Sequence, residues 1–405
     1  MGPFKLSILV LPATSQLIGL QVNALLVGRN PGLLWSLPQL LFRAGFSVDV
    51  IASAPLMRRA KFVRSYEHVP SFQPLLPALI PKIRDNYDWI IPTEDPILAE
   101  VLKSSLSIED KLKLLPVLKE ENLSHIYSKI GLSNIFSSQG VNTPPFRLVR
   151  SLQEALAEAT HLGYPVLLKQ DASGAGVGVF ECNAPSDFGL IKKEVFKEPL
   201  LLQKMIRGIE LDLSAVFLEG ELVHFSYSKI EKSCSKFGPS WLRTYRPLHA
   251  VEESIFQELS QIGKVLGAHG FTNIACIESN QSRFYFEVDL RPNVWVQTPR
   301  FFGEDPALRI RKWFTQKETL RYPVAAETHQ PSQILVPFFL RLRRRDLLLN
   351  RYQAWRFIPK DDLKLVMRLI LTQLLPLKSY LIALIKRTLP KKYQDTARRI
   401  YRNWT

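Results

Sequence analysis

The chain has 405 residues, of which 46% are hydrophobic and 22% charged, a composition that excludes a wholly disordered or fibrous protein. Its three cysteines lie far apart and in no Cys/His cluster, which excludes a disulfide framework and a structural zinc site and favours a reducing compartment. The formal charge of +16 is concentrated in residues 332–405, which contain 17 Lys and Arg, 4 Asp and no Glu, and the nearly neutral remainder argues against a nucleic-acid partner.

The first 123 residues alternate between segments typical of strands and of helices. The apolar run at residues 6–11 has no small-residue cleavage signal after it, and we interpret it as a strand rather than as a secretion signal. Strands separated by segments of helical length are typical of parallel βαβ units. We therefore expect a parallel sheet with strands at 6–11, 47–51 and 88–92 and helices at 32–45, 75–86 and 96–105.

The chain becomes rich in strands after a helix predicted at residues 152–162. Short apolar runs bounded by turn residues predict the strands, and one amphipathic segment predicts a long helix among them. The predicted strands are 166–169, 178–182, 200–204, 211–218, 221–227, 273–278 and 284–290, and the long helix is 252–269.

A glycine-rich loop joins two of these strands. Lys169 ends the first strand, and glycines follow at alternate positions, Gly174, Gly176 and Gly178. Because glycine has no Cβ, such a loop can bring backbone N–H groups close to phosphate oxygens. It is not a Walker A loop, since no Gly-Lys-Ser/Thr begins a helix, nor a dinucleotide fingerprint, since a strand follows. A flexible hairpin turn is the alternative interpretation.

Three segments in this order resemble the ATP-grasp family, the carboxylate–amine ligases related to biotin carboxylase, carbamoyl phosphate synthetase and D-alanine ligase. They are residues 166–179, 200–211 and 284–292, and the resemblance includes the N-terminal region and extends to about residue 302. It implies an α/β and α+β architecture, in which a parallel, Rossmann-like pre-ATP-grasp domain (1–123) precedes a two-lobed ATP-grasp fold. The lobes are 124–208, with the glycine loop, and 209–331.

The resemblance also implies roles for individual residues. Lys129 and Lys169 would hold the phosphates of ATP, and Arg291 would join Lys169 in catalysis by facing the transferring phosphate or the acyl substrate. Glu287 and Asp289, two apart on one strand and so on one face, would hold Mg²⁺ or Mn²⁺. The other implied nucleotide contacts are Ser173, Gly174, Gly176 and Gly178 in the loop, the backbone groups of Gln203, Lys204 and Ile206 at the adenine, and Glu210 at the ribose.

Residues 226–243 resemble the family's loop that closes over the substrate. Lys229, Lys236 and Arg243 are the candidates there for binding a carboxylate or an acyl phosphate, with solvated surface charges as the alternative. The metal site departs from the family pattern, because Ala275 stands where a second metal ligand is usual and a methyl group cannot bind Mg²⁺. Either Asn273 or Glu278 substitutes in a shifted register, or one of the family's usual two metals is weakly held.

These features predict an ATP-dependent ligase that activates a small-molecule carboxylate as an acyl phosphate for attack by an amine. The alternative is a degenerate module that binds nucleotide without turnover. The basic tail, residues 332–405, has no apolar stretch long enough to span a bilayer, and we expect amphipathic helices there. They would lie on an anionic membrane surface or meet an acidic partner, with a helical cap on the body as the alternative. The expected location is cytoplasmic. If the tail lies on a membrane, the protein would be peripheral to its inner face.

Overall fold

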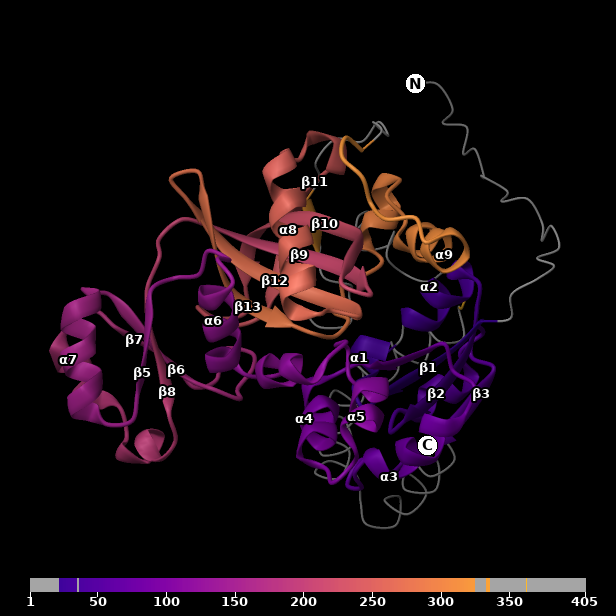
Figure 1. Cartoon of the computed structure of the whole chain (residues 1–405), viewed down its shortest axis with the longest axis horizontal. Coiled ribbons are helices and arrows are strands. Elements are labelled where there is room, and N and C mark those ends of the chain that lie inside the picture. Colours follow the sequence, from indigo (N-terminus) through magenta and orange to yellow (C-terminus); the bar gives the residue numbers. More distant parts are fainter. Residues whose placement is uncertain (1–21, 35, 325–332, 336–361, 363–405) are drawn as a thin grey trace, which may run out of the picture.

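The computed structural model describes residues 22–34, 36–324, 333–335 and 362, in which three β-sheets and the helices around them build the molecule (Figure 1). The strand expected at 6–11 and nearly all of the expected helical tail lie outside the described residues. At the start of that tail, β14 (Gln333–Leu335) is a strand rather than a helix, because it pairs with the edge of a sheet. In the tail, the Asp362 carboxylate also accepts a hydrogen bond from the Lys61 N–H at 2.6 Å.

Four parallel strands form the first sheet, in the order β3-β2-β1-β4. The parallel pairing expected for this region is therefore present. Its central strand β1 is missing from the predicted elements, because a strand buried on both faces shows no alternation of apolar and polar residues to detect. The strands are β1 (Val22–Gly28), β2 (Phe46–Ala52), β3 (Ser65–His68) and β4 (Trp89–Pro92).

The helices beside this sheet are short. The single helix expected at 32–45 is divided into α1 (Pro31–Leu34) and α2 (Leu37–Ala44), and α2 ends at Gly45, whose φ of 103° suits glycine. The helix expected at 75–86 is α3 (Leu76–Leu79) followed by a 3₁₀ turn. None of the helices in the described ranges is long and apolar enough to cross a membrane. The other helices here are α4 (Asp95–Lys103) and α5 (Ile108–Leu114).

A four-stranded antiparallel sheet, in the order β5-β8-β6-β7, forms the small lobe. Its strands alternate: Leu200 and Leu202 pack with α7 in one small core, which leaves Gln203 on the opposite face. The predicted bounds of α7 and β8 are both confirmed. The elements are β5 (Phe146–Val149), α7 (Leu152–Leu162), β6 (Val166–Gln170), β7 (Val179–Cys182) and β8 (Leu200–Lys204).

The largest sheet has six strands, in the order β13-β12-β9-β10-β11-β14. The segment expected to be a substrate loop at 226–243 is mostly a β-hairpin of this sheet, because Trp241, Leu242 and Tyr245 are buried there. Only its tip, residues 234–239, lies outside the strands. The elements are β9 (Ile209–Leu218), β10 (Glu221–Ser233), β11 (Ser240–Arg246), α8 (Glu253–Leu266), β12 (Gly270–Ser279) and β13 (Ser282–Asp289).

The first sheet and the six-stranded sheet share two hydrophobic cores. Trp89 of β4 stacks on Phe271 of β12, with ring centroids 5.2 Å apart and an interplanar angle of 8°. The small lobe has a separate core and lies on the other side of the large sheet (Figure 1). The two antiparallel sheets therefore face each other across a space, and this space holds the site. The remaining helices are α6 (Lys129–Ser138) and α9 (Pro306–Gln316).

Candidate active site

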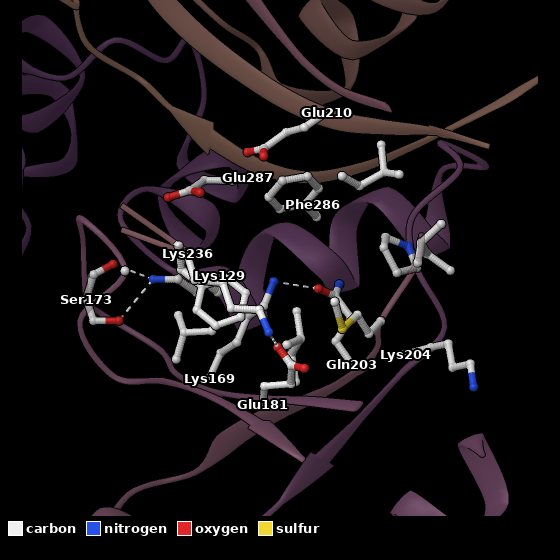
Figure 2. Close-up of a pocket in the computed structure, with 18 of the residues that line it drawn as sticks. Lys129, Lys169, Ser173, Glu181, Gln203, Lys204, Glu210, Lys236, Phe286 and Glu287 are labelled. Atoms are coloured by element: carbon white, nitrogen blue, oxygen red, sulfur yellow. Dashed lines mark hydrogen bonds and ion pairs between the residues drawn. The ribbon is translucent and has the colours of Figure 1, made fainter. Parts of the chain in front are cut away.

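A cavity of about 520 Å³ lies between the small lobe and the six-stranded sheet. Basic side chains and the glycine loop line one end, where Lys129, Lys169 and Ser173 lie close together (Figure 2). Apolar side chains, among them Leu167, Ile206 and Phe286, form much of the remaining wall. A cavity of this size, with few polar groups on an apolar lining, is typical of a small-molecule site. Most of the predicted nucleotide contacts line it: Lys129, Lys169, Ser173, Gly174, Gly176, Gln203, Lys204, Ile206 and Glu210.

Lys169 is buried in the wall of this cavity, with 5% of its surface exposed. Its Nζ donates a hydrogen bond to Gln203 Oε1 at 2.7 Å and lies 5.1 Å from the centre of the Phe286 ring. Burial lowers the pKa of Lys169 to about 8; the Glu287 carboxylate acts in the opposite direction, and the Lys129 ammonium adds to the decrease. The Lys169 ammonium makes few hydrogen bonds to the described protein groups, so it is available to bind an anion.

We expect the affinity of the cavity for a nucleoside triphosphate to fall at high pH. A phosphate binds the charged form of Lys169, and above about pH 8 a growing share of the free protein carries the neutral amine. The dissociation constant should therefore rise by up to about tenfold per pH unit above that pKa. Calorimetric titrations with ATP between pH 7.5 and 9.5 measure this, and equal affinities at the two ends would contradict it, because an ordinary lysine stays charged over this range.

Lys129 joins the glycine loop to the first turn of α6. Its Nζ donates hydrogen bonds to the carbonyl oxygens of Asp171, at 3.1 Å, and of Ser173, and to Ser173 Oγ. The Asp171 carboxylate in turn accepts from Ser128 Oγ at 3.0 Å and from the Ile130 N–H at 2.8 Å. These contacts hold the loop next to the α6 N-terminus, where the helix dipole favours negative charge.

Two glycines of the loop, Gly176 and Gly178, are required for different structural reasons. A Cβ on Gly176, at φ 78°, would lie 2.4 Å from the carbonyl oxygen of Phe237, so the loop packs directly against the tip of the β10–β11 hairpin. A Cβ on Gly178, at φ 73°, would lie 2.3 Å from Gln170 Oε1. Gly178 is not among the residues lining the cavity, so its place is in the turn into β7 rather than beside a ligand.

Acidic side chains enter from the large sheet. Glu210 and Glu287 point into the cavity opposite the lysines (Figure 2). Burial raises the pKa of Glu210, and the neighbouring carboxylates of Asp212 and Glu287 add to the increase. The described residues contain no cluster of three or more Asp, Glu, His or Cys side chains that could hold a metal alone. Mg²⁺ commonly binds one or two carboxylates together with phosphate oxygens and water, and Glu287 fits that arrangement.

Ala275 lies directly opposite Glu287 on the neighbouring strand and offers no ligand. The two substitutes expected from the sequence are both engaged elsewhere. Glu278 forms an ion pair with Arg283 at 3.4 Å, on the other face of the sheet. Asn273 Oδ1 accepts hydrogen bonds from Asn293 Nδ2 and from Ser214 Oγ. Neither residue lines the cavity, so a shifted ligand stays a prediction for both.

Asp289 and Arg291 lie beside the main cavity rather than in it. Arg291 donates from Nε to Asp95 Oδ1 at 2.8 Å and pairs through a terminal nitrogen with Asp289 at 3.1 Å. Burial raises the pKa of Asp289, and the Arg291 guanidinium opposes the increase. A small adjoining cavity of about 30 Å³ connects Asp289 and Asp95 with Glu287, Lys129 and Ser173. Sequence reasoning missed Asp95. This residue begins α4, beside the first sheet, and only the fold brings it close to Arg291.

The three residues predicted to bind substrate lie in different environments in the structure. Lys236, at the hairpin tip, lines the main cavity and forms an ion pair with Glu181 of β7. Lys229 is 47% exposed, pairs with Glu231 at 3.3 Å and does not line the cavity. Arg243 is buried in a bidentate ion pair with Asp212, at 2.6 and 2.7 Å, and is likewise absent from the cavity wall.

The role expected for Lys204 used its backbone groups, and its side chain turns away from the cavity (Figure 2). Its Nζ donates to the carbonyl oxygens of Gly163, at 2.6 Å, and Tyr164, at 3.1 Å. Only the main chain of Lys204 is left to contact a ligand. Two cavity residues that sequence reasoning missed, Glu181 and Phe286, carry no motif that would have singled them out.

No protein-family model matches the chain. It is 25% identical over 236 residues to the carbamoyl phosphate synthase large chain of Lachnoclostridium phytofermentans, covering 54% of this chain and 21% of that protein. It is 27% identical over 88 residues to the D-alanine–D-alanine ligase of Geobacter sulfurreducens, covering 21% of this chain and 28% of that one. The chain thus spans only about a fifth to a quarter of the curated relatives it matches.

Among solved structures, the biotin carboxylase domain of the 2-oxoglutarate carboxylase of Hydrogenobacter thermophilus, in complex with MgADP, ADP and bicarbonate, is similar in fold. Its TM-score is 0.58 at 16% identity, with 75% of this chain and 72% of that chain covered. The chain therefore has an ATP-grasp fold, and the resemblance to the ATP-grasp superfamily is confirmed.

Proposed function

We propose that the chain is an ATP-dependent ligase that activates a carboxylate as an acyl phosphate and passes the acyl group to an amine. The observation that carries this proposal is the cavity itself: Lys129, Lys169 and the glycine loop face the Glu287 carboxylate across one end of it. Cations, backbone donors and a hard oxygen ligand in one place are the parts that phosphoryl transfer needs. The likeness to a carbamoyl phosphate synthase and to a D-alanine–D-alanine ligase supports the class of reaction.

In this proposal, the base of ATP contacts the apolar part of the cavity wall, and its phosphates lie between Lys129 and Lys169. Lys169 and Lys129 bind phosphate oxygens, and the loop residues Ser173, Gly174 and Gly176 cover them. Glu287 would hold Mg²⁺, which when bound neutralises charge on the phosphates. The glycine loop and the tip of the β10–β11 hairpin already touch at Gly176 and Phe237. Together they exclude the water that would hydrolyse an acyl phosphate.

The acyl substrate would enter from the side of Arg291. A carboxylate oxygen attacks the terminal phosphorus of ATP, the bond to the bridging oxygen breaks, and ADP leaves with that electron pair. Arg291 is held between Asp95 and Asp289, and these two carboxylates line the small cavity together with Glu287 and Ser173. An amine then attacks the acyl carbon and releases phosphate. Lys236 is the one predicted substrate residue placed to contact these groups.

The same proposal includes the organisation of the chain. The three sheets draw their strands from residues 22–92, 146–204 and 209–335, which supports a division into the domains 1–123, 124–208 and 209–331. Association of the tail with an anionic membrane surface and a cytoplasmic location remain predictions from the sequence.

Trapping with hydroxylamine tests the reaction class. The full chain is incubated with MgATP, pooled small carboxylates and hydroxylamine, which attacks an acyl phosphate to give a hydroxamate and phosphate. We expect ADP and hydroxamate in equal amounts, dependent on the carboxylate pool. ATP binding without ADP formation under any of these conditions would contradict the ligase proposal and identify a nucleotide-binding module without turnover.

A further inference from the structure

The side chain of Arg291 is held by a carboxylate from a different part of the fold. Its Nε donates to Asp95 Oδ1 at 2.8 Å, and both side chains are only 18% exposed. A second contact of 3.1 Å joins a terminal nitrogen of Arg291 to Asp289, two residues earlier in the chain. A guanidinium is planar and has donors at Nε and at both terminal nitrogens. A contact at one terminal nitrogen alone would let the group pivot, so the bond at Nε is needed to fix its plane.

Asp95 is itself held in place beside the first sheet. It is the first residue of α4 and directly follows Glu94, the N-cap residue of that helix. The Glu94 carboxylate accepts hydrogen bonds from the Arg29 N–H at 2.8 Å and from the Asn30 N–H at 3.1 Å, in the segment that follows β1. The start of α4 is therefore anchored to the end of the central strand, and Asp95 has a fixed position relative to the first sheet.

The packing of the first sheet against the large sheet does not depend on Asp95. The two sheets share hydrophobic cores, in which Trp89 stacks on Phe271. The chain after β13 makes further contacts with the helices beside the first sheet, because Gln297 donates to the carbonyl oxygen of Ser36 and Arg43 pairs with Asp305. Loss of Asp95 should therefore release the Arg291 side chain and leave this packing intact.

We propose that Asp95 is a positioning residue, which sets the orientation of the Arg291 guanidinium for phosphoryl transfer to the carboxylate. Asp95 acts through Arg291, so the rate of the reaction depends on a residue that the first sheet supplies. This inference rests on the proposed ligase function and adds to it a residue outside the main cavity.

Three substitutions of Asp95 separate positioning from an effect of its charge alone. Asp95→Asn keeps an acceptor oxygen at the same place without the charge, Asp95→Glu keeps the charge but moves it by one methylene, and Asp95→Ala loses both. The rate of ADP formation is measured on the full chain with saturating MgATP, pooled small carboxylates and hydroxylamine. We expect it to fall by about 100-fold in Asp95→Ala and Asp95→Glu, and by less than about fivefold in Asp95→Asn.

Nucleotide affinity is the second readout, and a positioning role should leave it unchanged. The dissociation constant of MgATP, measured by calorimetry, should stay within about twofold of the wild-type value in all three variants, because Asp95 does not line the main cavity. Glu109→Ala is the matched control, because Glu109 forms an ion pair of 2.8 Å with Lys113 on the neighbouring helix α5. We expect the wild-type rate and affinity in this control.

A wild-type rate in Asp95→Ala, or a faster rate in Asp95→Glu than in Asp95→Asn, would overturn the inference and leave the proposed function standing. A loss of MgATP affinity as large as the loss of rate would also overturn it, because the role of Asp95 would then be structural. If Asp95→Ala does not fold, as judged by its thermal melting, the order of the other two variants decides. No ADP formation by the wild type would overturn both the inference and the proposed function.

Discussion

Replacing Lys169 by methionine is expected to weaken the binding of MgATP by about 100-fold. The variant removes a buried cation whose one hydrogen-bonded side chain among the described residues is Gln203, and methionine nearly preserves the shape of the stem. A charge-assisted hydrogen bond in a buried site contributes about 1.5–3 kcal/mol, and each 1.4 kcal/mol is about tenfold in affinity. The measurement is a calorimetric titration of the variant and the wild type at pH 7.5.

The fold should tolerate this change. Burying an ammonium opposes folding, as the lowered pKa of Lys169 indicates, so its loss should not reduce the melting temperature by much. Lys111→Met is a matched control, because Lys111 also donates to a single partner, the carbonyl oxygen of Leu102, far from the cavity. Wild-type affinity in Lys169→Met would contradict the assignment of the phosphate end.

Replacing Glu287 by glutamine is expected to abolish the metal dependence of nucleotide binding and to reduce ADP formation by at least about 100-fold. Glu287 is the carboxylate that points into the phosphate end, and Ala275 opposite it supplies no second ligand. A site that relies on so few carboxylates loses most of its hold on Mg²⁺ when one is neutralised. The measurement compares ATP affinity with and without Mg²⁺ and then ADP release.

Metal-free binding should survive the same substitution. The glutamine removes a negative charge near the triphosphate, so ATP without Mg²⁺ should bind the variant at least as well as it binds the wild type. Glu278→Gln is the control, because Glu278 lies on the adjacent strand but pairs with Arg283 on the other face. A metal-dependent affinity that persists in Glu287→Gln would show that the metal ligands lie elsewhere.

Much of the small lobe could be predicted because its signals are local. Helix α7 begins at an N-cap serine, Ser151, whose Oγ accepts from the Glu154 N–H, and it ends at Gly163. These capping residues define a helix without any tertiary information. The strands β6 and β8 begin with short apolar runs next to turn residues, a signal that is visible in the sequence alone.

The residues that were misplaced depend on distant parts of the chain. Arg243 is a loop cation only if β11 does not form. Its burial against Asp212 arises because β9 and β11 both pair with β10, which brings together two residues that are 31 apart in sequence. Arg291 is held by Asp95, nearly 200 residues earlier, so its partner has no local signal.

Calorimetric titration of the full chain with ATP, with and without Mg²⁺, tests the central claim most directly. A nucleotide site between the two sheets predicts one ATP bound per chain, tighter with Mg²⁺ than without it, and weaker at pH 9.5 than at pH 7.5. No heat of binding in either condition at high concentrations of ATP would contradict the account, because the cavity, its lysines and its glycine loop would then serve another ligand.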